Sequence, residues 1–175
     1  MQMPRRDPLA HAEKLIPLVY AYAAYRLGDG PDADDATGDT IERAVRYRKK
    51  YDPSKGEPLA WLIGIARNCI ADLVAAREEV VDEPLPEGAT DDLEEGTTRR
   101  LTLRLAVARL DERERELIAL RYGADLTARQ IGVVLGMRKN AVEVALHRAL
   151  ARLRAELDRE PSIELRPTTS RAVSS

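Results

Sequence analysis

The sequence predicts an all-α protein made of two small helical domains joined by a flexible acidic linker. Aromatic residues make up only 4% of the 175 residues, and there is no Phe. A sheet core usually draws on aromatic and β-branched residues, whereas the abundant Ala, Leu, Arg and Glu of this chain favour helix. Residues 78–98 carry nine acidic side chains and no basic one. Because such a segment repels itself and buries little surface, it is expected to separate two lobes as an extended linker.

The charge is unevenly distributed along the chain. The net charge of −2 argues against a nucleic-acid-binding protein. However, residues 99–160 carry 14 basic and 9 acidic groups, whereas residues 1–77 carry 12 and 11. The block after the linker is therefore the part in which a DNA-binding surface is expected.

The first lobe, residues 9–77, is predicted to contain three or four helices. Apolar residues recur at helical spacing from Leu15 to Leu27, with Pro17 either kinking the helix or setting its first turn. Pro31 then opens a second helix, whose inner face would hold Ala33, Ala36, Thr40, Ile41 and Ala44. A turn-rich loop at residues 51–56 leads into a strongly apolar third helix at residues 58–77.

The second lobe, residues 99–158, is predicted to contain four helices. The first would bury a face made of Leu101, Leu105 and Ala108. The next two are expected to begin with capping boxes, formed by Asp111 with Glu114 and by Thr127 with Gln130. A fourth helix runs to about residue 158, and residues 159–175 read as a disordered tail.

A short helix, a glycine-containing turn and a longer basic helix have the layout of a helix-turn-helix. Gly132 is small where two helices must approach closely, and Gly136 suits a left-handed turn. An ordinary helical pair with a solvated charged face is the competing interpretation. In a helix-turn-helix, the early residues of the second helix reach base edges and their neighbours hold phosphates. Here these residues are Arg138, Lys139, Asn140, Glu143, His147 and Arg148.

Two blocks in the first lobe resemble the extracytoplasmic-function (ECF) sigma factors of bacterial RNA polymerase, in the sigma-70 superfamily. DADDATGDTIERA, at residues 32–44, resembles that family's D-A-E-D-L-x-Q-E-T-F-x-R-A block. YDPSKGEPLAWLIGIARN, at residues 51–68, is similar to F-D-P-x-R-G-x-x-x-A-W-L-x-x-I-A-R-N. The segment LDERERELIALRY at residues 110–122, followed by the helix-turn-helix, resembles the family's fourth conserved region.

The resemblance implies that the two lobes have different binding functions. The family's second helix binds the clamp helices of the polymerase's largest subunit; here that surface would be Asp34, Asp35, Asp39, Glu42 and Arg43. The loop and the third helix engage the −10 element as single strand, and the candidates are Tyr51, Lys55, Trp61, Arg67 and Asn68. Trp61 is expected to be mainly structural and Asn68 to touch DNA. The helix-turn-helix residues named above would read the −35 element.

The chain departs from the family pattern at several positions. Gly38 and Asp39 replace a Gln-Glu pair, and Gly38 should cost its helix about 1 kcal/mol. Arg138 replaces a capping Ser. Residues 141–145 read AVEVA instead of T-V-K-S-R, which removes two cations and adds an acid. Weaker phosphate affinity than the family norm is therefore expected.

The sequence thus predicts a sigma factor that binds core RNA polymerase and promoter DNA, with an anti-sigma factor as a further partner. The alternatives are a helix-turn-helix regulator acting without polymerase and a sigma-like interaction protein with weakened promoter binding. No enzyme motif, cofactor site or metal-ligand cluster stands out, and Cys69 is expected to be a small buried apolar residue. No signal peptide or 18-residue apolar run is visible, so a cytoplasmic protein without membrane insertion is expected.

Overall fold

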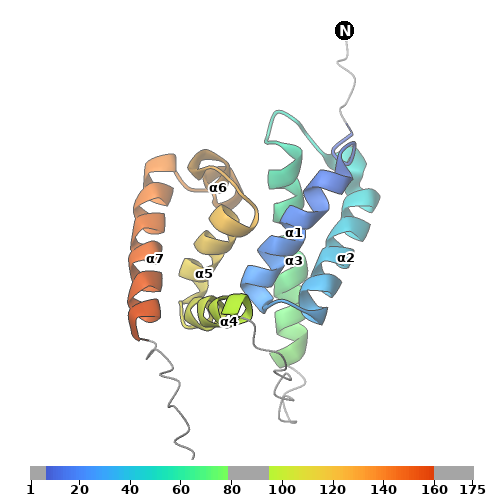
Figure 1. Ribbon diagram of the computed structural model, residues 1–175. Coiled ribbons are helices and arrows are strands. Elements are labelled where there is room, and N and C mark those ends of the chain that lie inside the picture. Colours follow the sequence, from blue (N-terminus) through green and yellow to red (C-terminus); the bar gives the residue numbers. More distant parts are fainter. Residues whose placement is uncertain (1–6, 79–94, 160–175) are drawn as a thin grey trace, which may run out of the picture.

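The computed structural model describes residues 7–78 and 95–159, and every regular element in these two ranges is helical (Figure 1). The all-α prediction is confirmed. The interior of the predicted linker and the predicted tail, apart from Arg159, lie outside the described residues. Helix reaches into both ends of the predicted linker, because the helix before it ends at Glu78 and the helix after it begins at Glu95.

The first lobe is a bundle of three long helices and one short turn. Its elements are α1 (Ala12–Leu27), α2 (Pro31–Tyr47), the 3-10 turn η1 (Arg48–Lys50) and α3 (Pro58–Glu78). Pro17 lies inside α1, and Pro31 occupies the first turn of α2 after Gly30, whose φ is 139°. The predicted inner face of α2 is buried, except that Ile41 is half-buried and Thr37 joins it. Cys69 is buried, as expected.

The second lobe contains four α-helices and one π-helical turn. They are α4 (Glu95–Ala108), α5 (Glu112–Ile118), η2 (Ala119–Gly123), α6 (Ala128–Leu135) and α7 (Lys139–Arg159). Both predicted capping boxes form: the Asp111 side chain accepts from the Glu114 N–H at 2.7 Å, and Thr127 pairs reciprocally with Gln130. The starts of α5 and α6 are therefore fixed by local sequence.

The predicted inner face of α4 is wrong. Leu105 is 44% exposed and Ala108 is exposed, while Ala106, Val107 and Leu110 are buried against α7. The apolar residues of this segment fit two helical registers. Packing against Ala149 and Leu153 of α7 distinguishes them. Arg115 donates to the carbonyls of Ala108 and Leu110 at 2.9 and 3.0 Å, which closes the corner between α4 and α5.

The two lobes lie against each other, with α1 packed on η2 and α3 on α6 (Figure 1). One continuous buried cluster draws on both lobes, including Tyr22 and Ala23 of α1 with Leu120 and Ala124 of the second lobe. A Cβ added at Gly123 would lie 2.9 Å from the Tyr22 Cα, so the glycine permits this backbone approach. No sequence pattern predicted this contact.

Helix α3 packs one face into the core, and much of its last two turns is exposed. In the described part of the chain, it is the one helix long and apolar enough to cross a membrane by composition, with a hydropathy of 1.5 over Pro58–Arg77. However, Leu62, Ile63, Ala66 and Ile70 are buried in the shared cluster. Its apolar character is therefore accounted for by the protein core.

Candidate functional site

The helix-turn-helix of α6 and α7 is built by two glycines. Gly136 ends α6 with φ 66° and ψ 32°, in the left-handed region. A Cβ on Gly132 would lie 2.5 Å from the Met137 carbonyl oxygen, so only glycine admits the turn at this position. The left-handed turn predicted at Gly136 is confirmed, whereas the close approach at Gly132 is to the backbone of the turn and not between the two helices.

All six residues predicted for −35 recognition lie on exposed positions at the turn and along the first half of α7. The main-chain carbonyl of Arg138 accepts the first intrahelical hydrogen bond, from the Val142 N–H at 3.1 Å, so Arg138 lies at the helix start. Lys139 and Glu143 form an ion pair of 3.2 Å. Asn140, His147 and Arg148 are exposed. Because Glu143 neutralises Lys139 locally, this helix presents less net positive charge than its basic residues suggest.

The residues predicted for the −10 element divide into a structural pair and an exposed pair. Tyr51 is buried, its hydroxyl donates to the Gly56 carbonyl at 3.0 Å, and its ring centroid lies 5.5 Å from that of Trp61. These two rings fix the loop before α3. Lys55 and Asn68 are exposed and able to meet a ligand.

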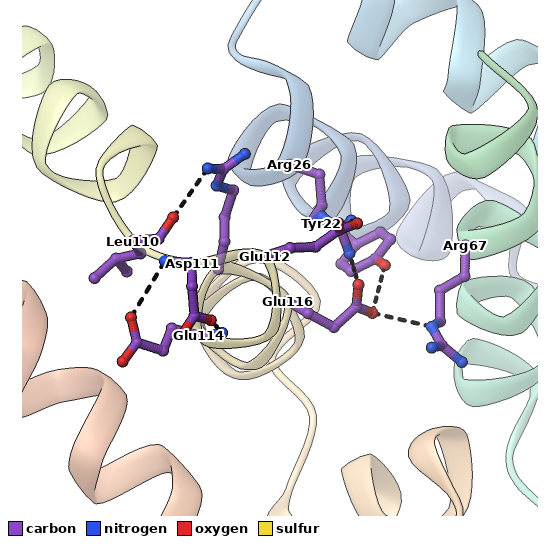
Figure 2. Close-up of polar contacts among 9 residues, drawn as sticks. Tyr22, Arg26, Arg67, Leu110, Asp111, Glu112, Glu114 and Glu116 are labelled. Carbon is purple, nitrogen blue, oxygen red and sulfur yellow. Dashed lines mark hydrogen bonds and ion pairs between the residues drawn. The ribbon is translucent and has the colours of Figure 1, made fainter. Parts of the chain in front are cut away.

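Arg67, the fifth residue of that set, is occupied by the second lobe. Its Nε donates to Glu116 Oε1 at 3.0 Å, and its Nη1 donates to the Val134 carbonyl at 3.2 Å. Figure 2 shows Glu116 of α5 between Arg67 and the α1 residues Tyr22 and Arg26. The Tyr22 hydroxyl donates to Glu116 at 2.8 Å, and Arg26 pairs with both Glu116 and Glu112.

The centre of the cluster around Glu116 is almost closed to solvent, whereas Arg67 at its edge is 38% exposed. The side chains of Arg26 and Glu116 are each 10% exposed. Burial raises the pKa of Tyr22, so its hydroxyl stays protonated and remains a donor. A buried carboxylate is tolerated because three donors surround it.

The residues predicted to bind polymerase lie along one side of α2. Asp34, Asp35 and Asp39 line an open groove of about 550 Å³ together with Gly38, Cys69, Asp72 and Leu73. Arg43 forms a 2.8 Å ion pair with Asp72 of α3, and this hydrogen bond raises the pKa of Arg43. Glu42 pairs with Arg46 at 2.7 Å. The surface is therefore acidic at the start of α2 and locally neutralised towards its end.

Tyr22, Arg26 and Glu116 were missed by sequence reasoning. A signal was present for Glu116, which lies four residues before Leu120 and thus shares the apolar face of its helix. A carboxylate on such a face needs partners. Which partners it would find could not be predicted, because they come from the other lobe.

Comparison with known proteins matches both lobes. Residues 12–79 match the family described as Sigma-70 region 2, and residues 106–155 match Sigma-70, region 4. The chain is 34% identical over 168 residues to the ECF RNA polymerase sigma factor ShbA of Streptomyces griseus, covering 85% of each chain. It is 29% identical over 143 residues to the ECF sigma factor BldN of Streptomyces coelicolor, covering 77% of this chain and 54% of BldN. Among solved structures, the sigma factor RpoE of Bartonella quintana, in complex with the anti-sigma factor NepR, superposes with a TM-score of 0.69 at 21% identity. That match covers 85% of this chain and 95% of RpoE.

Proposed function

Because the chain belongs to the ECF family of RNA polymerase sigma factors, we propose that it binds core RNA polymerase and directs promoter-specific initiation of transcription. The first lobe contacts the core enzyme and opens the −10 element, and the second lobe reads the −35 element. The protein acts as a binding subunit in the cytoplasm and not as an enzyme.

The observation that carries this proposal is the exposed row of polar residues on α7. A helix of this kind places its first residues along the major groove, where Asn pairs with adenine and a carboxylate accepts from cytosine. Asn140 and Glu143 offer these two groups one turn apart. Arg138 and Arg148 flank them as exposed cations able to meet phosphate.

The acidic groove on α2 supports the polymerase contact. Asp34, Asp35 and Asp39 are exposed there, and the groove they line is open to a partner. An acidic surface favours a partner with basic side chains and speeds their encounter. A regulator that worked without polymerase would not need this surface.

Run-off transcription with purified core polymerase on fragmented genomic DNA tests the proposal. We expect discrete transcripts that require both the core enzyme and this chain. Duplex binding without transcription would instead favour the helix-turn-helix regulator. Core binding without promoter selection would favour the sigma-like interaction protein, an alternative that the Lys139–Glu143 pair supports by reducing the positive charge of α7.

We also propose an anti-sigma factor as a regulatory partner. Sigma factors of this type are commonly held by such proteins, and RpoE was crystallised with one. Co-purification of a partner that suppresses run-off transcription would test this part of the proposal.

A further inference from the structure

Two arginines of the first lobe converge on one carboxylate of the second. Arg26 comes from α1, Arg67 from α3 and Glu116 from α5 (Figure 2). The Tyr22 hydroxyl completes the set of donors at 2.8 Å. Three donor side chains of the first lobe therefore point to the same buried carboxylate.

The donors that hold a carboxylate also suit a phosphate. Guanidinium groups bind both anions through paired N–H donors, and a hydroxyl adds a third direction. If Glu116 moved away, Arg26 and Arg67 would face an open space, and the positive charge there would exceed the negative charge. Glu112 would be the remaining acid paired with Arg26. Arg67 and the exposed Asn68 are neighbours in the chain on α3, so this space adjoins the surface proposed to hold the −10 strand.

We propose that Arg26, Arg67 and Tyr22 form a binding site for a backbone phosphate of single-stranded DNA, and that Glu116 masks this site while the two lobes are packed together. The assignment of the DNA as promoter DNA rests on the proposed function. Glu116 thereby acts as an internal substitute for the phosphate, and the packed arrangement is a closed state.

The packed molecule is too small to reach both promoter elements at once, so the closed state has to open. A compact chain of this length has a radius of gyration of roughly 15 Å. The −10 and −35 elements lie about 25 base pairs apart, which is about 85 Å of B-form duplex at roughly 3.4 Å per base pair. The packed lobes cannot reach both elements together, so promoter binding has to separate α5 and α6 from α1 and α3.

Neutralising Glu116 should favour the open state. In Glu116→Gln the packed lobes would hold the buried Arg26 and the half-buried Arg67 without the carboxylate, a costly arrangement that opening relieves by hydration. Gly123→Ala gives an independent route to the same state, because the added Cβ would lie 2.9 Å from the Tyr22 Cα and 3.0 Å from the Ala21 carbonyl. Asp158→Asn is the matched control: it removes the same charge from the same lobe at an exposed position of α7 that lies outside this cluster.

The full-length variants are compared by small-angle X-ray scattering and by fluorescence anisotropy with a labelled single strand of about 12 nucleotides, a length that a small domain can hold. Circular dichroism verifies that each variant is folded. We expect Glu116→Gln and Gly123→Ala to have a larger radius of gyration and tighter single-strand binding, and Asp158→Asn to behave as the unmodified protein. Two freed cations should steepen the slope of log K against log salt concentration by about 1.4, since each single-strand phosphate contact contributes about 0.7.

The double variant Glu116→Gln, Arg26→Gln decides whether Arg26 binds the DNA. It should remain open but lose about half of the added salt dependence. An open Glu116→Gln protein with unchanged single-strand affinity would overturn the phosphate site, and unchanged compactness in both opening variants would overturn the mask. Neither readout uses polymerase or a promoter, so a failure here is distinct from a failure of run-off transcription.

Discussion

Replacing Gly132 by alanine tests how the turn of the helix-turn-helix is built. The new Cβ would lie 2.5 Å from the Met137 carbonyl oxygen, whereas ordinary contacts begin near 3.4 Å. The turn would have to move by about 0.9 Å, and the Met137 N–H already donates to the Gly132 carbonyl at 2.8 Å. Overpacking of this kind costs about 1–3 kcal/mol, against about 1 kcal/mol gained from the helix propensity of alanine.

Gly64→Ala is the matched control for this substitution. Gly64 lies inside α3, and an added Cβ would meet nothing within 4 Å. This variant should therefore gain about 1 kcal/mol of stability from helix propensity alone. The propensity contribution is common to both variants, so the difference of about 1–3 kcal/mol between them isolates the steric effect at Gly132.

Urea unfolding followed by circular dichroism at 222 nm measures both free energies of unfolding by linear extrapolation. For a chain of this size each kcal/mol corresponds to about 2–4 °C in Tm, so heating gives a second measurement. Gly132→Ala should also weaken duplex binding, because the turn sets the angle of α7. A Gly132→Ala protein as stable as Gly64→Ala would refute the assigned contact.

Four further predictions concern the polymerase surface, the −10 surface, the recognition helix and the buried cysteine. The double variant Asp35→Lys, Asp39→Lys should weaken core binding by about tenfold or more, since attraction becomes repulsion. The control Glu13→Lys, Asp158→Lys makes the same change in charge elsewhere and should not weaken core binding. Equal effects of the two double variants in a pull-down would refute the proposed polymerase surface. Asn68→Ala should impair strand opening, measured by permanganate footprinting, more than duplex binding. Asn140→Ala should impair duplex binding more than strand opening. Normal strand opening with Asn68→Ala would contradict its −10 role. Glu143→Lys should change the sequence selected from a randomised −35 library at fixed salt, because a base-reading carboxylate is lost; uniformly tighter binding with unchanged preference would mean that Glu143 is only solvated. Burial raises the pKa of the Cys69 thiol above its usual 9.0. Alkylation of Cys69 should therefore be slow in the folded protein, and its rate should still increase with pH above pH 9. Fast alkylation at neutral pH would rule out this burial.

The elements of the fold were predictable where local signals set them. Capping boxes at Asp111 and Thr127 determined two helix starts, and Gly136 determined the turn between α6 and α7. The inner face of α4 was mispredicted because its apolar residues fit two registers, and only packing against α7 distinguishes them. The π-turn η2 was also missed, because it has no sequence signature comparable to a cap.

The exposure of most candidate residues was predictable from the sequence, but their arrangement was not. The exposure of Asn68 and of the α7 residues agrees with helical periodicity, and Lys55 lies in the exposed turn before α3. The resemblance to the family selected these residues as candidates. The engagement of Arg67 by Glu116 could not, because it depends on how two lobes separated by a variable linker come together. In the sequence, long-range pairing of this kind is indicated only indirectly, by an acidic residue on an apolar helical face.

The buried cluster shared by the two lobes has a consequence for how the protein comes apart. While the lobes are packed, Tyr22 and Leu120 belong to one cooperative unit, so heating should melt both halves in a single transition. Separating the lobes in the folded state instead exposes apolar surface on α1 and η2, which is unfavourable in water. A partner that opens the protein must therefore cover that surface as well as compete for the charges, and either half expressed alone should tend to self-associate through it.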